Sequence, residues 1–289
     1  MRRKKLHGGI KALNYTYHAL RAFGMFFWLS AKYEYLGVKS IINQMRSLKS
    51  TVEANPTVQE AVKNVKKRQA SATKTPATFV PMEPISTIKG DFQRFGERLR
   101  NASSIVLIAG RRGSGKSVLG FRVMENIHAK TQRPAYVVGV KQEVLPVWIE
   151  SVEQIEDVKN GGVVLVDEGA IAFSSRDSMS KKNKALGKLL AIARHKDLTL
   201  ILITQNTGMI DKNVLNLTDT ILLKEGSLLQ EKMERSVMKE IYVNANNALN
   251  AIPQEERQSH VYVFDNDFEG VVKVMLPSFW SSKVSKNQA

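Results

Sequence analysis

The amino-acid sequence predicts an α/β protein whose parallel sheet is covered by helices on both faces. Three observations predict it. Short runs rich in Val, Ile and Leu recur along the chain, segments with apolar residues at helical spacing separate them, and Gly, Asn and Asp turn signals stand between the two kinds of segment. Such runs suit strands that are buried on both faces of a parallel sheet. Because each helix crosses over between parallel strands, the carboxyl ends of the strands meet at one edge.

The expected elements alternate from residue 91 onward. Apolar residues at helical spacing indicate helices over 117–128 and 183–195, and the turn Asp265-Asn266-Asp267 separates two apolar runs as in a hairpin. In chain order we expect a helix over 91–100, strand 105–108, helix 117–128, strand 135–140, helix 144–158, strand 163–166, helix 183–195, strand 198–204, a short helix near 211–217, strand 220–223, helix 231–250 and strands 260–264 and 270–275.

A glycine-rich octapeptide, Gly110–Ser117, directly follows the apolar run Ile105–Ile108 and has the pattern GxxxxGK[ST]. Such a loop turns its N–H groups toward a phosphate, and the helix that follows adds its positive dipole end. Lys116 would reach the β- and γ-phosphates and Ser117 would hold Mg²⁺, so the expected cofactors are ATP and Mg²⁺. The residues that we expect to bind the nucleotide are Gly110, Gly113, Ser114, Gly115, Lys116, Ser117 and Val118.

An acidic pair ends another expected strand. Gly161-Gly162 is a turn signal, the run Val163–Val166 suits a buried strand, and Asp167 and Glu168 follow it. This is a Walker B pattern, in which Asp167 would hold the Mg²⁺ shell and Glu168 would activate the attacking water. A solvated strand end is the alternative interpretation of the pair. The intact phosphate loop favours the catalytic one.

A further apolar run, Leu198–Thr204, ends in Gln205, whose side chain would stand at the level of the γ-phosphate. Gln205 is therefore the expected γ-phosphate sensor, with a polar strand end as the alternative. The strand over 135–140 lies between Walker A and Walker B in the sequence. We take it as the inserted strand that places this P-loop NTPase in the additional-strand catalytic-glutamate (RecA-like) type.

The order of motifs after Walker B resembles the FtsK/HerA superfamily of DNA-pumping ATPases. The residues that carry the resemblance are Ala193-Arg194-His195, Thr204-Gln205, Ile210-Asp211 and the segment 216–224. The same order is similar to the ATPase domain of zonular-occludens-toxin-like phage assembly proteins, a branch of that superfamily, and these motifs do not separate the two. The resemblance covers about residues 100–225.

This resemblance implies a ring, which we expect to be a hexamer, that translocates or packages double-stranded DNA. The loop 173–184, with its Lys and Arg residues, would face the pore and contact DNA phosphates, an ordinary solvated loop being the alternative. Arg176 and Arg194 are the candidates for an arginine finger that acts from an adjoining subunit. A cation at a helix C-terminus also explains Arg194, because the helix dipole favours it there.

The charge of the chain is concentrated at its N-terminal end. The formal net charge is +16, and residues 1–70 hold 14 of the 43 Lys and Arg but only 3 of the 27 Asp and Glu. Such an excess favours a polyanionic partner, either nucleic acid or an anionic membrane surface. We expect a basic, mainly helical region over 1–69, a proline-containing linker over 70–87 and the ATPase domain with its C-terminal hairpin over 88–289.

An aromatic patch at Ala22–Leu29 lies inside this basic region. It is too short to span a bilayer, which needs about 20 apolar residues, so it is either a packed helix stripe or an interfacial anchor. It is also a candidate contact for a capsid, portal or membrane-assembly partner through residues 1–69. The chain has no cysteine, which fits a reducing compartment. We expect a cytoplasmic protein, with association to a virion or membrane as the alternative.

Three functions remain open from the sequence. The first is an oligomeric ATPase that translocates DNA for packaging, conjugation or segregation. The second is a zonular-occludens-toxin-like ATPase for virion assembly or export at a membrane. The third is a nucleotide-dependent switch or scaffold, which the water-activating pair Glu168 and Gln205 disfavours.

Overall fold

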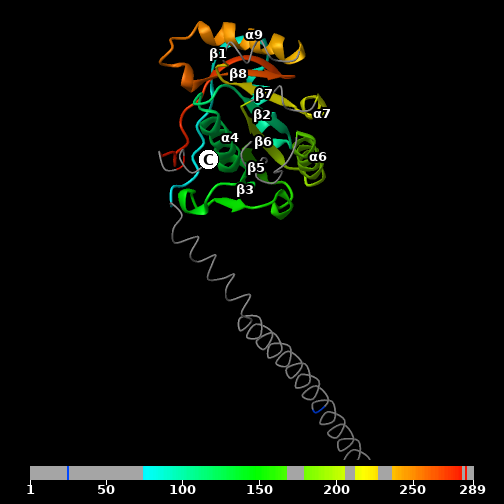
Figure 1. Ribbon diagram of the computed structural model, residues 1–289. Helices are drawn as coiled ribbons and strands as arrows, with labels where there is room; N and C mark the ends of the chain where they lie inside the picture. The colour runs from blue at the N-terminus through cyan, green and yellow to red at the C-terminus, as the bar shows by residue number, and fades with distance from the viewer. Residues whose placement is uncertain are drawn as a thin grey trace, which may run out of the picture. The chain divides into compact units, whose positions relative to one another are not determined.

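The computed structural model divides the chain into two compact units, Met1–Lys67 and Arg68–Ala289. It describes residues 74–167, 179–205, 212–226 and 236–281, together with Met25 and Val284. The fold described below is that of the second unit, which Figure 1 shows as the coloured ribbon.

The second unit is built on one mixed sheet in the order β1-β9-β8-β7-β2-β6-β5-β3-β4. The six strands from β7 to β4 are parallel, and β8, β9 and β1 extend them in antiparallel pairing. The strands are β1 Glu83–Gly90, β2 Ile105–Ala109, β3 Ala135–Val138, β4 Ile149–Val152, β5 Val163–Asp167, β6 Thr199–Thr204, β7 Thr220–Leu223, β8 His260–Asp265 and β9 Phe268–Lys273.

Helices cover both faces of this sheet (Figure 1). Successive residues of β2 alternate between two apolar clusters: Val106 and Ile108 pack with α4, whereas Ile105 and Leu107 lie in the cluster that contains α6. This alternation is the reason that the strands are apolar throughout. The helices are α3 Phe92–Asn101, α4 Lys116–Thr131, α6 Met179–His195, α7 Lys212–Asn216 and α9 Ser236–Asn250, with short 3₁₀ turns η1 Gln142–Val144, η2 Ile155–Asp157 and η4 Arg257–Ser259.

The α/β class and the P-loop NTPase fold are confirmed, but the expected helix over 144–158 is wrong. The segment instead forms η1, the strand β4 and η2. Ile149, Val152, Ile155 and Val158 are buried at a spacing of three, which resembles a helical stripe. However, β4 pairs in parallel with β3 and supplies the outer edge of the sheet. Backbone pairing with β3 therefore overrides the helical pattern.

The inserted strand of the additional-strand type is also different from the one that we expected. Strand β3 lies outside β5, whereas β6 lies between β2, which carries the phosphate loop, and β5, which carries Walker B. The additional-strand type was therefore predicted correctly, but the strand that we identified as the inserted one was wrong. Order along the chain does not give order in the sheet, because a crossover connection can place the next strand on either side.

Residues 74–87 are part of the ATPase unit rather than a linker. Strand β1 begins at Glu83 and pairs with β9, and Thr78 and Val80 donate their backbone N–H groups to side chains of α4 at 3.0 Å each. The prolines of this segment suggested a linker. Pro84 lies in an edge strand, where a missing N–H group costs no hydrogen bond on the open side.

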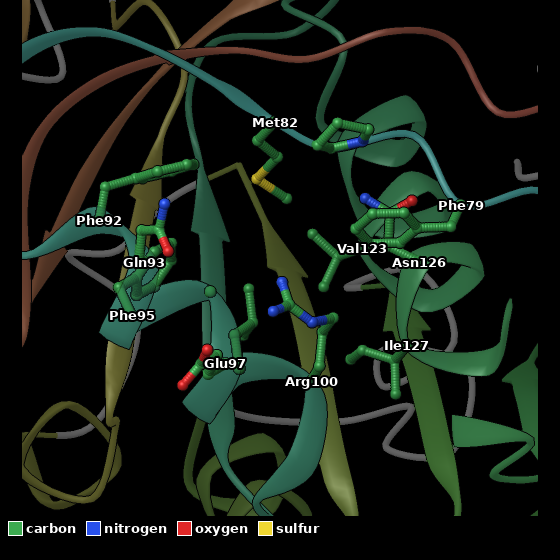
Figure 2. Close-up of a pocket in the computed structure, with 13 residues that line it drawn as sticks. Phe79, Met82, Phe92, Gln93, Phe95, Glu97, Arg100, Val123, Asn126 and Ile127 are labelled. Carbon is green, nitrogen blue, oxygen red and sulfur yellow. The ribbon is translucent and has the colours of Figure 1, made fainter. Parts of the chain in front are cut away.

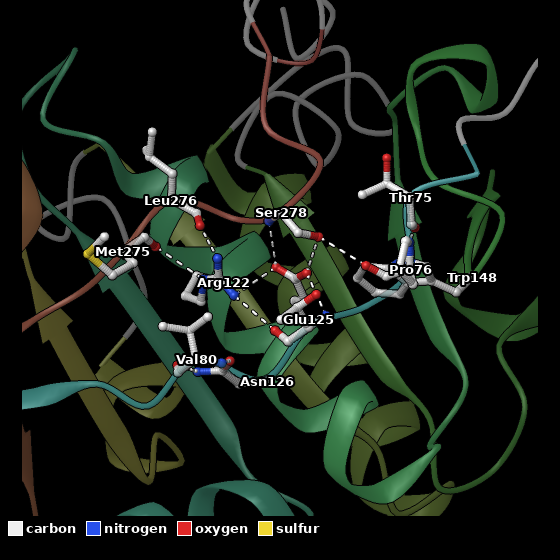
Figure 3. Close-up of polar contacts among 11 residues, drawn as sticks. Thr75, Pro76, Val80, Arg122, Glu125, Asn126, Trp148, Met275, Leu276 and Ser278 are labelled. Atoms are coloured by element: carbon white, nitrogen blue, oxygen red, sulfur yellow. Dashed lines mark hydrogen bonds and ion pairs between the residues drawn. The ribbon is translucent and has the colours of Figure 1, made fainter.

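A buried polar cluster on α4 holds two distant parts of the chain against this helix (Figure 3). Arg122 and Glu125 form an ion pair at 3.0 Å, with side chains 2% and 0% exposed. Arg122 donates to the carbonyl groups of Thr78, Met275 and Leu276, and Glu125 accepts from Thr78 and Ser278. Burial lowers the pKa of Arg122, while the Glu125 carboxylate acts in the opposite direction. The helix that starts at the phosphate loop thus anchors both residues 78–80 and the C-terminal segment 275–278.

Candidate nucleotide site

The three motifs expected from the sequence lie at one edge of the sheet. Ala109, the last residue of β2, is paired with Thr204, and Asp167, the last residue of β5, is paired with Ile203. The phosphate loop therefore begins beside the strand end that leads into Gln205, and Asp167 lies one residue earlier on the far side of β6. The carboxyl edge of a parallel sheet is where ligands bind in such folds.

The phosphate loop needs its glycines for backbone conformation. Gly113 and Gly115 have φ angles of 79° and 89°, a region that favours glycine. Gly115 is the N-cap residue of α4 and has no side chain that could accept from the first N–H groups of the helix. These N–H groups, which have no partner inside the helix, are the donors that a phosphate would use.

The side chain of Lys116 lies within the loop. It is 7% exposed, and its Nζ atom donates to the carbonyl oxygens of Gly110 at 3.0 Å and Arg111 at 2.9 Å. The loop thus wraps around an ammonium group. That arrangement concentrates positive charge at the helix N-terminus.

Ser114 gives an independent test of whether a phosphate fits this loop. Its hydroxyl oxygen is one of two buried side-chain oxygen atoms that have no hydrogen-bond partner in the described part of the chain. A Cβ atom added to Gly110 would lie 3.0 Å from that oxygen and 2.8 Å from Lys224 Cβ, so only glycine fits there. A buried hydroxyl without a partner costs free energy unless it finds an acceptor. A phosphate oxygen would supply one.

The proposed Mg²⁺ ligands lie on two neighbouring elements. Ser117 is in the first turn of α4 and Asp167 ends β5, and both are partly exposed. Among the described residues, no group of three His, Cys, Asp or Glu side chains could hold a metal ion. At a nucleotide site, Mg²⁺ takes one or two protein ligands and completes its shell with phosphate oxygens and water.

The remaining predicted site residues are only partly covered by the structure. Gln205 follows β6 directly and is exposed. Glu168 and Arg176 lie outside the described residues. So does the first half of the expected pore loop 173–184, whereas its second half belongs to α6, which already begins at Met179. Val118 lies in the first turn of α4, next to Ser117.

Arg194 does not belong to the nucleotide site of its own chain. It is exposed in the last turn of α6, and the chain enters β6 at Thr199, at the amino end of that strand. The phosphate loop lies at the carboxyl end of the strands. The six residues of β6, or roughly 20 Å, separate this end from the amino end near Arg194. Arg194 could therefore complete only the site of another copy.

An ion-pair cluster beside the loop was not expected from the sequence. Arg111 Nη2 lies 2.6 Å from one carboxylate oxygen of Glu225, and Arg257 Nη1 lies 3.2 Å from the other. Burial alone would raise the pKa of Glu225, but hydrogen bonds from the two arginines outweigh it and lower that pKa. Because Arg111 and Glu225 are 114 residues apart, no local sequence pattern could predict this contact.

Lys224 is the second feature whose role the sequence did not indicate. It follows β7 and is 3% exposed, and its Nζ atom donates to the carbonyl oxygens of Gln258 at 2.5 Å and His260 at 2.7 Å. Burial lowers the pKa of this lysine to about 7, against an opposing effect of Glu225. A lysine that ends an otherwise apolar strand next to the phosphate loop was the available signal.

A separate pocket of about 230 Å³ lies between residues 79–82 and the helices α3 and α4 (Figure 2). Phe92, Phe95, Val123 and Ile127 form its apolar walls, and Arg100 lies at its side. Val123 and Ile127 are two and three turns beyond Lys116 on α4. The pocket is therefore distinct from the phosphate loop.

Comparison with known families gives one match. Residues 106–225 match the model of the zonular occludens toxin (Zot) family. This confirms the resemblance to P-loop ATPases of that branch, over nearly the same residues as the motifs indicated. No curated protein sequence matches the chain. Among the described residues, none of the helices has the length and apolarity that crossing a membrane requires.

Solved structures similar to the chain include a viral packaging NTPase, a conjugation coupling protein and a KaiC-like protein. The genome packaging NTPase B204 from Sulfolobus turreted icosahedral virus 2, in complex with AMP, has 17% identity and a TM-score of 0.43, and the match covers 60% of this chain and 98% of that one. The pCW3 conjugation coupling protein TcpA has 14% identity and a TM-score of 0.43, covering 63% and 62%. A KaiC-like protein from Pyrococcus horikoshii OT3 has 14% identity and a TM-score of 0.35, covering 50% and 82%.

Proposed function

We propose that this chain is a Mg²⁺-dependent ATPase that works as a motor on double-stranded DNA, with several copies arranged in a ring. The observation that carries the ATPase part is the meeting of the phosphate loop, Asp167 and Gln205 at the carboxyl edge of three adjacent strands. A strand end or a glycine-rich turn alone would be weak support. The proposal is supported because the phosphate loop, Asp167 and Gln205 occur together at one edge of the sheet.

In this mechanism the backbone from Gly113 to Val118 binds the phosphates, and Lys116 leaves the loop carbonyls to pair with the β- and γ-phosphates. Ser117 and Asp167 would hold Mg²⁺, which neutralises the charge that develops on the phosphate oxygens. Glu168 follows Asp167 directly and would take a proton from the attacking water. Gln205, after β6, would contact the γ-phosphate and report whether it is present.

The ring is supported by the place of Arg194. A P-loop ATPase gains several orders of magnitude in rate from an arginine that neutralises charge in the transition state. Arg194 is exposed at the end of the sheet opposite the phosphate loop of its own chain. It would act on the site of an adjoining copy, and Arg176 is the alternative candidate. The number of copies that we propose is six.

The DNA part of the proposal rests on charge. The formal net charge of +16, most of it in residues 1–70, provides a surface that binds phosphate backbones independently of base sequence. A motor must move along any sequence, so backbone contacts suit it better than base contacts. We propose residues 1–69 as the region that binds DNA or another assembly partner.

A second function is favoured by a specific observation, the match of residues 106–225 to the zonular occludens toxin family. On this alternative the same ATPase would power virion assembly or export at a membrane, and the N-terminal region would bind anionic lipid. Both functions use the same nucleotide chemistry. They differ in the polyanion that the basic region contacts.

The experiment that tests the proposal measures ATP hydrolysis by the full chain with double-stranded DNA, with anionic liposomes and with neither. We expect DNA to stimulate turnover, and Lys116→Ala to abolish hydrolysis under all three conditions. Stimulation by liposomes alone would replace the DNA function with the assembly function. Wild-type turnover in Lys116→Ala would remove the ATPase assignment itself.

A further inference from the structure

Lys224 lies directly behind the phosphate loop. Its backbone N–H donates to Ala109 at 2.8 Å, and the N–H of Arg111 donates to the carbonyl of Glu225 at 3.0 Å. These two bonds continue the parallel pairing of β7 with β2 into the first residues of the loop. The backbone of the loop is thus fixed to the segment that carries Lys224.

The side chain of Lys224 runs along the loop from its first glycine to its last. A Cβ atom added to Gly110 would lie 2.8 Å from Lys224 Cβ, and one added to Gly115 would lie 3.7 Å from Cε and 3.9 Å from Nζ. The ammonium group therefore lies next to Gly115, the N-cap residue of α4. This is the point at which a P-loop receives the phosphate groups of its ligand.

This ammonium has no carboxylate partner at hydrogen-bond distance among the described residues. Two of its N–H groups donate to the carbonyls of Gln258 and His260. The carboxylate of Glu225, which favours the charged form of Lys224, is already bound by Arg111 and Arg257. A buried charge with carbonyl partners only is costly. Burial accordingly lowers the pKa of Lys224 to about 7.

We propose that Lys224 is a positioning residue for the nucleotide, whose buried ammonium supplies a second fixed positive charge to the phosphates from behind the loop. The inference rests on the proposed nucleotide site and gives a role to Lys224, the last residue of the segment 216–224, to which the sequence analysis assigned none. Lys116 reaches the phosphates directly. Lys224 acts through the field that it adds at Gly115 and through the two carbonyls with which it fixes the start of β8 to the loop.

This arrangement couples nucleotide binding to a proton. A bound phosphate stabilises the charged ammonium and raises the pKa of Lys224 in the complex. The contribution of Lys224 is complete below pH 7 and is lost as the pH rises through the pKa of the complex, so binding takes up a proton near neutral pH. The segments around it also carry charged or titratable groups, among them Arg111, Arg112 and Lys116 on the loop, Glu225, Arg257 on η4, and His260, Tyr262 and Asp265 on β8.

The test measures binding of a non-hydrolysable ATP analogue with Mg²⁺ to the full chain by calorimetry, between pH 6 and 9, in buffers of different ionisation enthalpy. Lys224→Met keeps the volume of the side chain and removes the charge. We expect affinity to fall about ten- to hundredfold at pH 6.5, as Coulomb attraction at an effective dielectric constant of about 20 implies. Proton uptake should disappear as well.

Two further variants separate charge from packing. Lys224→Arg keeps a charge that does not titrate near neutral pH, so it should retain affinity and lose proton uptake. Lys239→Met removes an exposed lysine on α9 and should change neither. The difference between the wild-type and Lys224→Met profiles cancels the titration of the nucleotide itself.

The outcomes distinguish this inference from the proposed function. Wild-type affinity and proton uptake in Lys224→Met, together with lost binding in Lys116→Ala, would overturn the role of Lys224 and leave the site intact. Unchanged binding in Lys116→Ala would remove the site and the inference with it. A lower melting temperature of Lys224→Met with an unchanged pH profile would show that Lys224 is structural only, and would also overturn the inference.

Discussion

At the scale of single residues, the proposed mechanism divides two tasks between the neighbours Asp167 and Glu168. Asp167 ends the strand, where a carboxylate can reach a metal ion on the phosphates, and Glu168 is the next residue. A metal ligand and a general base have different substitution effects. Loss of the ligand weakens binding, whereas loss of the base slows only the chemical step.

We therefore expect Glu168→Gln to bind ATP with near-native affinity and to hydrolyse it at least ~100-fold more slowly, the size of a general-base effect. Asp167→Asn should weaken Mg²⁺-dependent binding. Fluorescent nucleotide titrations with and without Mg²⁺, beside single-turnover hydrolysis, separate the two. Near-native turnover in Glu168→Gln would place the catalytic base elsewhere in the chain.

The residues of the candidate site show which features a sequence can predict. The phosphate loop and Asp167 are local patterns, and their common edge of the sheet was predicted from the strands that they follow or end. The contacts of Lys224 and of the Arg111–Glu225–Arg257 cluster could not be predicted in this way. Their partners come from the loop, from the segment after β7 and from the segment that leads into β8, which the pairing of β7 with both β2 and β8 brings together.

At the scale of elements, α4 packs closely against the sheet through Gly120. A Cβ atom at this position would lie 2.6 Å from Leu165 Cδ1 and 3.2 Å from Ile203 Cδ1, both in fully buried side chains. In α6, by contrast, a Cβ atom at Gly187 meets nothing within 4 Å. Close packing of α4 on the sheet thus requires a glycine at position 120, whereas nothing in the structure explains the glycine at position 187.

These two positions form a matched pair of alanine substitutions. Gly120→Ala should destabilise the fold by about 1–3 kcal/mol through overpacking, whereas Gly187→Ala should stabilise it by about 0.5–1 kcal/mol through helix propensity. Urea unfolding of both variants measures the difference. Equal effects of the two substitutions would contradict the close packing of α4 on β5 and β6.

The buried pair Arg122–Glu125 makes α4 the anchor of residues 78–80 and 275–278 (Figure 3). Glu125→Ala leaves Arg122 buried without its partner and should cost about 3–5 kcal/mol. Glu240→Ala, at an exposed position of α9, should cost far less. The double variant Arg122→Met with Glu125→Leu should recover only part of the loss, because the backbone groups of residues 78 and 275–278 still lack their partners. Denaturant midpoints of the three variants measure this, and full recovery would contradict the anchoring role of the pair.

Among the elements, strands were easier to predict than their order. The runs that became β2, β5, β6 and β7 are apolar because both faces of the sheet are covered. The misjudged segments lie at the edges of the sheet: β4 has a helical spacing of apolar residues, and β1 contains a proline and is exposed throughout. Edge strands are not buried on both faces, so they lack the continuous apolar run from which a central strand can be predicted.

At the scale of the whole molecule, the basic N-terminal region is expected to contact a polyanion. Substitution of Lys63, Lys66 and Lys67 by Gln should weaken duplex DNA binding and flatten its salt dependence. Each lost phosphate contact removes about 0.9 from the slope of log K against log salt. Hydrolysis without DNA should persist, because the nucleotide site lies in the second unit.

Fluorescence anisotropy between low and moderate salt measures this slope, and flotation with anionic liposomes serves as the parallel control. An unchanged DNA slope together with lost liposome binding would assign the basic region to a membrane surface. A change in basal hydrolysis would instead show that the two units act on each other without DNA.

The ring is a second property of the whole molecule, and the position of Arg194 gives it a test. Mixing Arg194→Ala with wild-type chain should reduce activity more than in proportion to the variant fraction, because each finger would serve the site of a neighbour. Hydrolysis measured across mixing ratios, beside light scattering with ATP and DNA, follows this. A strictly proportional decline would exclude Arg194 as a finger.

The most direct measurement of the central claim is displacement of a third strand from a triplex by the full chain on linear duplex DNA. The account predicts displacement that requires ATP and Mg²⁺ and is lost in Glu168→Gln, although this variant still binds DNA. Vigorous DNA-stimulated hydrolysis that never displaces the third strand would contradict a motor that moves along DNA.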